Sequence, residues 1–235
     1  MRNFKLFFFL SLLINIVFGI IIFKDKFYKY FDNYKEKSNN VYFLNRDELF
    51  KVFPKSKNSI IFIGNSLTQN FELAELFQNL SIKNRGIIGD YTSTLFNRLE
   101  PIIEEKPKKI FIEIGINDLG INLPNDSLVN NYLKIIDKLQ SKTPNSKIYI
   151  QSIFPVKNDS QYLKSITNPE VNKNVVLVNK ELKSICEKKN LTYIDIYSSF
   201  ELEGQMNPKY SIDGVHLNGA GYLLWRDKLK SFVEN

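Results

Sequence analysis

The chain has 235 residues, which is enough for one sizeable hydrophobic core, and its composition (43% hydrophobic, 24% charged) is that of a globular protein. The net charge of +7 would suit a nucleic-acid partner only if the basic residues lay on the main domain. Residues 1–58 carry 11 Lys and Arg against 5 Asp and Glu, whereas residues 59–235 carry 21 against 20, so we expect no nucleic-acid partner. One cysteine and one histidine exclude an internal disulfide and a zinc cluster built from these residue types, and we expect no metal.

The first predicted element is an apolar segment from Leu6 to Phe23, close to the length of about 20 residues that crosses a bilayer as a helix. Arg2 and Lys5 precede it, and no small-x-small cleavage pattern follows. Residues 1–23 are therefore predicted to be an uncleaved signal anchor that holds the protein at the membrane. The alternatives are a cleaved signal peptide and, third, a buried helix of a soluble protein. The short tail before the segment favours an extracytoplasmic main domain, periplasmic or at the cell surface.

Residues 24–58 are polar, aromatic and rich in lysine, which is typical of a juxtamembrane stalk, and they include a short predicted helix from Asn45 to Phe53. Residues 59–235 form the predicted main domain, in which short Ile-, Phe- and Tyr-rich runs alternate with helical periodicity. This alternation predicts an α/β fold with five parallel strands and helices on both faces of the sheet. The predicted strands are Ser59–Ile63, Ile82–Arg85, Lys109–Ile114, Lys147–Ile153 and Leu191–Ile196. The predicted helices are Thr68–Leu80, Thr92–Glu105, Asp126–Ser141, Asn172–Lys189 and Asn218–Val233.

Chemically distinctive residues follow the carboxyl ends of the predicted strands, where an open parallel sheet binds its ligands. Ser66 follows the first strand, Gly89 the second and Asn117 the third. Asp213 and His216 lie between the fifth strand and the last helix. Each residue alone has an ordinary structural explanation, but five such residues on one rim of the sheet favour an enzyme.

These residues can perform acyl transfer. His216 is the only histidine and so the only imidazole base, and Asp213, three residues earlier, is placed to orient its ring. Ser66 is then the candidate nucleophile. The backbone N–H groups of Ser66 and Gly89 and the side-chain amide of Asn117 are the candidate oxyanion hole.

The same segments resemble the sequence blocks of the SGNH hydrolases, also called the GDSL esterase/lipase family. The blocks occur in the family's order over residues 59–233, and the chain is most similar to the branch around platelet-activating-factor acetylhydrolase and related bacterial acylhydrolases. The resemblance implies a three-layer α/β/α, flavodoxin-like fold, the triad Ser66, His216 and Asp213, and no cofactor. One departure is Asn65, where the family commonly has Asp. The matching blocks read Gly64-Asn-Ser66-Leu, Asn84-Arg-Gly86-Ile-Ile-Gly89-Asp90, Gly115-Ile-Asn117-Asp118 and Asp213-Gly-Val-His216-Leu.

The resulting hypothesis is a membrane-anchored serine ester hydrolase that removes short acyl groups from a glycan or a lipid-like ester. One alternative is an O-acyltransferase that uses the same triad and passes the acyl group to a sugar. The other is a membrane-tethered, non-catalytic glycan-binding domain, which would have no need for all five candidate residues.

Three further residues are expected to have structural roles. Glu113, inside the third predicted strand, should bond to a neighbouring backbone or basic group because charges are rarely buried unpaired. Trp225 should pack in the core or against a helix. Cys186 should be a small core residue on a helical face that also carries Leu182 and Ile185.

Overall fold

The computed structural model describes residues 41–56, 58–158 and 170–235. The predicted signal anchor (residues 1–23) lies outside these ranges, as do residues 24–40 and 57 of the predicted stalk. Within the described ranges, no helix is both long enough and apolar enough to cross a membrane. The chain divides into two units after Asn45, and the second unit comprises Arg46–Asn235. Residues 41–52 are helical, so the helix predicted over Asn45–Phe53 begins earlier in the structure.

The second unit is built on one five-stranded parallel sheet, as predicted, with the strand order β2-β1-β3-β4-β5. This is the flavodoxin-like order, in which β2 lies on one side of β1 and the later strands are added on the other side, beginning with β3. The neighbours of β1 are therefore the strands that carry the second and third motifs. The strands are β1 (Ile60–Gly64), β2 (Ile82–Gly86), β3 (Lys109–Glu113), β4 (Lys147–Gln151) and β5 (Thr192–Ile194).

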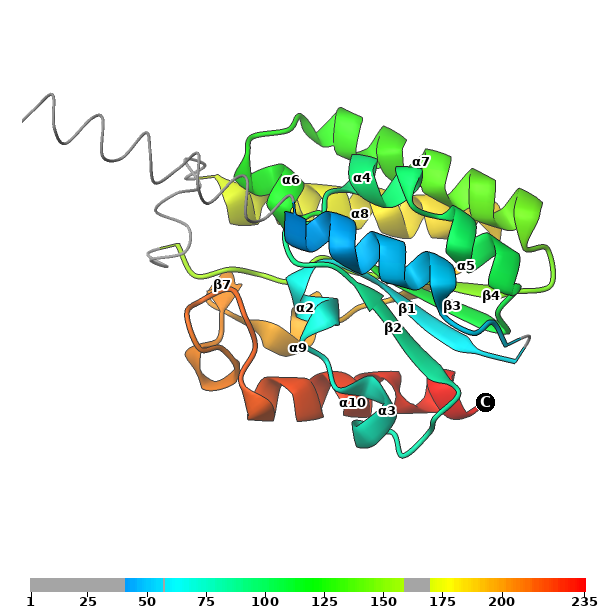
Figure 1. Cartoon of the computed structure of the whole chain (residues 1–235). Coiled ribbons are helices and arrows are strands. Elements are labelled where there is room, and N and C mark those ends of the chain that lie inside the picture. The colour runs from blue at the N-terminus through cyan, green and yellow to red at the C-terminus, as the bar shows by residue number, and fades with distance from the viewer. Residues whose placement is uncertain (1–40, 57, 159–169) are drawn as a thin grey trace, which may run out of the picture. The chain divides into compact units, whose positions relative to one another are not determined.

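Helices cover both faces of the sheet, which confirms the three-layer α/β/α architecture (Figure 1). Both side-chain rows of β1 are buried: Ile61 and Ile63 belong to the core on one face, and Ile60 and Phe62 to the core on the other. Such double burial explains why the central strands read as continuous apolar runs. On one face lie α4 (Thr92–Asn97), α5 (Glu100–Glu105), α6 (Ile116–Gly120), α7 (Asn125–Lys142) and α8 (Val171–Lys189); on the other lie α2 (Ser66–Gln69), α3 (Leu73–Leu76), α9 (Tyr197–Phe200) and α10 (Gly219–Glu234).

The single helix predicted over Thr68–Leu80 is wrong, because two short helices, α2 and α3, occupy this segment. Asn84 of β2 explains the break. Its side-chain amide donates to the backbone carbonyls of Thr68, Gln69 and Phe71, at 2.6, 3.2 and 3.0 Å. The side chain of Asn84 thus bonds to carbonyls at the end of α2 and in the turn that follows, and α2 ends after one turn.

The helix predicted over Thr92–Glu105 is also divided, into α4 and α5. Pro101 lies in the first turn of α5 and has no N–H to continue the ladder from α4. The prediction is correct for the longer helices α7, α8 and α10, whose ends differ from it by one residue at most. The structure adds short elements that the sequence pattern missed: α6, α9, a hairpin of β6 (Glu201–Leu202) and β7 (Gln205–Met206), and the 3-10 turn Pro208–Tyr210.

Two of the expected structural residues are confirmed. Trp225 is fully buried, stacks on Phe71 with ring centroids 4.6 Å apart, and donates from Nε1 to Oε1 of Gln151 at 2.7 Å. Cys186 is buried on α8 beside Leu182 and Ile185, and burial raises the pKa of its thiol to about 12. A thiol so far from ionisation is not a nucleophile at neutral pH.

Candidate active site

Ser66 is the first residue of α2 and lies directly beyond the carboxyl end of β1. The preceding Asn65 caps the helix, since its Oδ1 accepts from the backbone N–H of Leu67 at 2.9 Å. Gly86, at the end of β2, lets α2 pack closely against this strand, because a Cβ there would collide with the backbone of Gln69. The serine is thus held on a tight strand-to-helix turn, and its backbone N–H is one of the first-turn groups that have no partner within the helix.

The structure brings His216 to Ser66 across 150 positions of sequence. Oγ of Ser66 lies 3.1 Å from Nε2 of His216, and Nδ1 of His216 lies 2.7 Å from Oδ2 of Asp213. The three side chains therefore form one continuous chain of hydrogen-bonding groups. Ser66 is 5% exposed, while the side chains of His216 and Asp213 are 19% and 34% exposed, so the group lies at the surface end of the sheet.

Asp213 is held by the turn that carries the histidine. Its Oδ1 accepts from the backbone N–H groups of Val215 and His216, at 2.9 and 2.7 Å. Burial alone would raise the pKa of Asp213, but the hydrogen bonds from His216 and from these two backbone groups bring it below its ordinary value. The carboxylate is therefore ionised at neutral pH and faces the Nδ1 side of the imidazole.

The loop after β2 presents Gly89 to open space. Its φ is +76°, a conformation that favours glycine, and a Cβ at this position would meet no atom within 4 Å. The loop is tied to α2, because the backbone N–H of Ile88 donates to Oε1 of Gln69 at 2.9 Å. The space where a side chain of residue 89 would project is therefore open.

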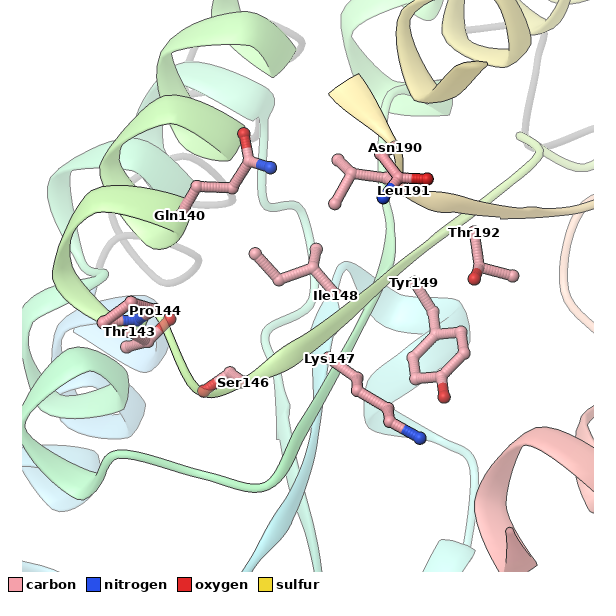
Figure 2. Close-up of a pocket in the computed structure, with 10 residues that line it drawn as sticks. All are labelled: Gln140, Thr143, Pro144, Ser146, Lys147, Ile148, Tyr149, Asn190, Leu191 and Thr192. Atoms are coloured by element: carbon pink, nitrogen blue, oxygen red, sulfur yellow. The ribbon is translucent and has the colours of Figure 1, made fainter. Parts of the chain in front are cut away.

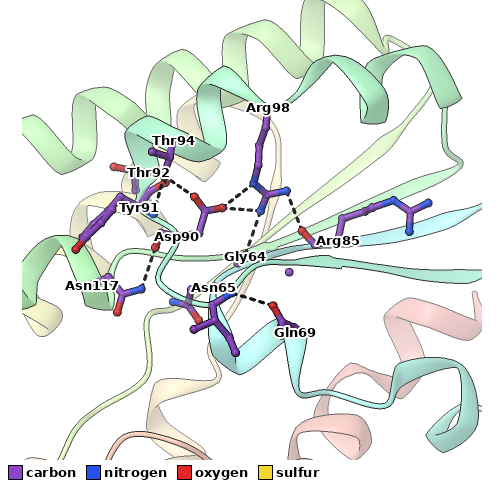
Figure 3. Close-up of polar contacts among 12 residues, drawn as sticks. Gly64, Asn65, Gln69, Arg85, Asp90, Tyr91, Thr92, Thr94, Arg98 and Asn117 are labelled. Atoms are coloured by element: carbon purple, nitrogen blue, oxygen red, sulfur yellow. Dashed lines mark hydrogen bonds and ion pairs between the residues drawn. The ribbon is translucent and has the colours of Figure 1, made fainter. Parts of the chain in front are cut away.

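Asn117 lies in α6, just beyond β3, and is connected to the same loop. Its Nδ2 donates to the backbone carbonyl of Asp90 at 2.9 Å, which uses one of the two N–H groups of the amide (Figure 3). The next residue, Asp118, accepts from the backbone N–H and the hydroxyl of Thr92, the hydroxyl at 2.6 Å. Burial raises the pKa of Asp118 to about 6. Two adjacent side chains of α6 therefore hold the segment between Gly89 and α4.

A buried ion pair supports this loop, and the sequence interpretation had not assigned it a role. The guanidinium of Arg98 bonds to Oδ2 of Asp90, with Nη2 at 2.5 Å and Nε at 2.8 Å (Figure 3). Burial raises the pKa of Asp90, and the charge of Arg98 opposes that shift. A signal was present in the sequence: Arg98 lies between Leu95 and Leu99 on the apolar face of its segment, where an exposed arginine would not be placed.

The expected bond between Glu113 and a neighbouring backbone or basic group is not present among the described residues. Glu113 is fully buried, and neither of its carboxyl oxygens has a hydrogen-bond partner among the described residues. Burial raises its pKa to about 8. It is the last residue of β3, and the strand alternation places its side chain with Phe111 on the α10 face. Glu113 is therefore predominantly neutral at pH 7.

A cavity of about 360 Å³ lies at the opposite end of the sheet from Ser66. Its walls include the first residues of β4 and β5, such as Lys147 and Thr192, together with Gln140 of α7 (Figure 2). Parallel strands separate their amino and carboxyl ends, so this cavity is not part of the serine site. In the part of the chain that the structure describes, no group of His, Cys, Asp and Glu is arranged to hold a metal ion.

Comparison with known proteins identifies a family and solved structures that this chain resembles. The model of the GDSL-like lipase/acylhydrolase family matches residues 62–224. A structure from Streptococcus pneumonia, provisionally assigned as a platelet activating factor, is similar with a TM-score of 0.75 and 26% identity, over 87% of this chain and 97% of that one. A GDSL-like lipase from Bacteroides thetaiotaomicron VPI-5482 is similar with a TM-score of 0.73 and 19% identity, over 82% and 97% of the two chains.

Sequence comparison with curated proteins gives relatives of a different name. The N-acylneuraminate cytidylyltransferase of Streptococcus agalactiae serotype III (strain NEM316) is 23% identical over 200 residues, which is 85% of this chain and 44% of the relative. The chain thus spans less than half the length of the curated relatives it matches.

Proposed function

The chain belongs to the GDSL-like lipase/acylhydrolase family, and we propose that it is a carboxylic ester hydrolase that removes short acyl groups through Ser66, His216 and Asp213. The observation that carries the proposal is the continuous contact from Oγ of Ser66 to His216 and from His216 to Asp213. A serine hydroxyl becomes an effective nucleophile when an oriented imidazole removes its proton.

In the proposed first half-reaction, Oγ of Ser66 attacks the ester carbonyl carbon while Nε2 of His216 takes the hydroxyl proton. The N–H groups of Ser66 and Gly89 and the amide of Asn117 stabilise the negative charge on the carbonyl oxygen. The tetrahedral intermediate then collapses, and the leaving alkoxide receives the proton from His216. This leaves the acyl group on Ser66 and the alcohol free.

In the second half-reaction, His216 removes a proton from water, which attacks the acyl carbonyl. Collapse of this second intermediate returns the proton from His216 to Oγ of Ser66 and releases the carboxylic acid. Asp213 stays ionised throughout and stabilises the imidazolium that forms in each half-reaction, in line with its lowered pKa.

We propose an O-acetylated sugar as the natural class of substrate. Esterases that are named for acetyl-xylooligosaccharide and for acetyl xylan share the fold, with TM-scores of 0.61 and 0.63 at 19% and 20% identity. The curated relatives are named for N-acylneuraminate, an acylated sugar acid. The exposure of His216 and Asp213 also suits a substrate that approaches from the surface.

The test is hydrolysis of p-nitrophenyl acetate and butyrate by the purified protein, compared with Ser66→Ala and the matched control Ser127→Ala. Ser127 lies in the first turn of α7 and belongs to neither the proposed triad nor the proposed oxyanion hole. We expect nitrophenol release that vanishes in Ser66→Ala and persists in Ser127→Ala.

Acetate release from acetylated xylo-oligosaccharides and from O-acetyl-N-acetylneuraminate then separates the two sugar classes. Transfer of acetyl to an added sugar acceptor, in place of acetate release, would favour the O-acyltransferase.

We further propose that residues 1–23 anchor the protein in a membrane and that residues 24–58 connect this anchor to the hydrolase domain. The support is the composition of Leu6–Phe23 and the basic residues on both sides of it. Extraction of membranes with sodium carbonate tests the anchor, and protease treatment of intact cells tests the extracytoplasmic location. Release of the full-length chain by carbonate would contradict the anchor.

A further inference from the structure

Arg98 connects the ends of two strands to the loop that carries Gly89. Besides its two bonds to Asp90, its guanidinium donates from Nη1 to the carbonyl of Arg85 at 2.9 Å and from Nη2 to the carbonyl of Gly64 at 3.2 Å (Figure 3). Gly64 ends β1, two residues before Ser66, and Arg85 is the penultimate residue of β2. One buried side chain therefore joins the backbone before Ser66 to the backbone before Gly89.

Asp90 extends this connection to Asn117. Its side chain bonds to Arg98 and accepts from the hydroxyl of Thr94 at 2.5 Å, while its backbone carbonyl accepts from Nδ2 of Asn117. Asp90 directly follows Gly89, so its side chain anchors the loop one residue after a proposed oxyanion donor. Its carbonyl orients the amide that bears another.

We propose that Arg98 and Asp90 form a positioning pair that sets the donors of Gly89 and Asn117 relative to Ser66. The inference rests on the proposed function. Neither residue is proposed to touch the substrate; both act through the backbone and through Asn117. Errors of about 1 Å in the placement of catalytic groups can cost roughly 100-fold in rate, so a rigid support for the donors has a direct kinetic value.

The contacts require arginine in particular. A planar guanidinium donates to several acceptors in fixed directions, and here it meets one carboxylate and two carbonyls at once. Lysine would keep the charge and could bond to Asp90, but its single ammonium group cannot reproduce the fork. The side chain of Arg98 is 3% exposed and that of Asp90 is fully buried, so water does not replace the lost contacts easily.

Arg85→Lys provides a matched control for Arg98→Lys. The side chain of Arg85 is also buried, at 7% exposure, but it extends toward Glu105 and does not bond to the Gly89 loop. Both substitutions exchange a buried guanidinium for an ammonium group close to the same strand end. Only Arg98→Lys is expected to disturb the oxyanion donors.

The experiment measures kcat and KM for p-nitrophenyl acetate in the purified full-length protein and in the two variants, together with inhibition by trifluoroacetone. This ketone forms a tetrahedral adduct with a reactive serine and so probes the oxyanion hole. We expect Arg98→Lys to lower kcat by roughly 10- to 100-fold with KM within about twofold, and to weaken trifluoroacetone inhibition in parallel. We expect Arg85→Lys to keep both values within about twofold.

Folding is checked by circular dichroism and by thermal unfolding of each variant. A folded Arg98→Lys with unchanged kcat and unchanged ketone inhibition would overturn the positioning role while leaving the serine hydrolase intact. Equal losses in both variants would also overturn it, since the effect would then follow stability. Wild-type protein without Ser66-dependent hydrolysis would overturn the proposed function and the positioning role with it.

Discussion

Oγ of Ser66 lies 3.1 Å from Nε2 of His216, although 150 positions of sequence separate them. The parallel sheet produces this contact, because β1 delivers the serine to its carboxyl edge and the loop before α10 returns the histidine to the same edge. Asn218, which caps α10 by accepting from the N–H of Gly221 at 3.0 Å, fixes where that loop ends. The proposed chemistry is thus a consequence of strand direction and helix capping.

The first prediction concerns Asp213. Asp213→Asn keeps the shape of the side chain but removes the charge that stabilises the imidazolium. Because the backbone N–H groups of Val215 and His216 hold the remaining oxygen, the amide NH2 takes the place of the acceptor that orients Nδ1–H. We expect kcat for p-nitrophenyl acetate to fall by about 10²- to 10⁴-fold, with little change in KM. Asp195→Asn is the matched control, since Asp195 is exposed and bonds to Ser198. Equal activity of the two variants would remove Asp213 from the proposed triad.

The second prediction concerns Asn117. Asn117→Ala removes one proposed oxyanion donor and the bond to the carbonyl of Asp90. We expect a loss of about 10²- to 10³-fold in kcat. Asn125→Ala, which removes an amide that bonds to Asn174, serves as the control. A folded Asn117→Ala variant with wild-type kcat would exclude the amide from transition-state stabilisation.

The third prediction concerns the pH dependence of stability at Glu113. Its pKa is about 8 in the folded protein against an ordinary value of 4.5, so the folded state holds a proton that the unfolded state releases between these values. The contribution of Glu113 to the free energy of unfolding is largest below about pH 4.5. It falls as the pH rises to about 8, by up to about 1.4 kcal/mol per pH unit. Glu113→Gln stays neutral and should not show this loss.

Urea denaturation of wild type and Glu113→Gln at pH 5.5, 6.5 and 7.5 measures the difference. The variant should gain in free energy of unfolding relative to wild type at each step upward in pH. Glu181→Gln, at an exposed position of α8, should track the wild type at all three values. A constant difference between Glu113→Gln and wild type would mean that Glu113 is ionised in the folded protein.

The fold was predictable from the sequence where hydrophobicity alone determines the structure. Both faces of β1 and β3 are buried, so the sequence shows β1 as an apolar run and β3 as three apolar residues between Lys109 and Glu113, and the long helices α7 and α8 show a clear helical period. The division of the helix predicted over Thr68–Leu80 was not predictable from periodicity, because it depends on the Asn84 side chain of a neighbouring strand. Tertiary hydrogen bonds of this kind leave no periodic signal.

The candidate site was also predictable only in part from the sequence. Ser66, Asp213 and His216 were identifiable because each belongs to a chemically distinctive residue type at a strand end, and the structure brings them into contact. The support from Arg98 was not identified, since a salt bridge to Asp90 and two backbone carbonyls can be recognised only when β1 and β2 are paired. Glu113 was interpreted wrongly, because burial without a described partner departs from the usual behaviour of carboxylates.

The most direct test of the central claim is to identify the residue that becomes covalently modified. Purified protein is treated with a fluorophosphonate, which phosphonylates activated serines with loss of fluoride, and the peptides are analysed by mass spectrometry. The account predicts one adduct on the peptide that contains Ser66, absent in Ser66→Ala and formed much more slowly in His216→Ala. An unmodified Ser66, or ester hydrolysis that persists in Ser66→Ala, would contradict it.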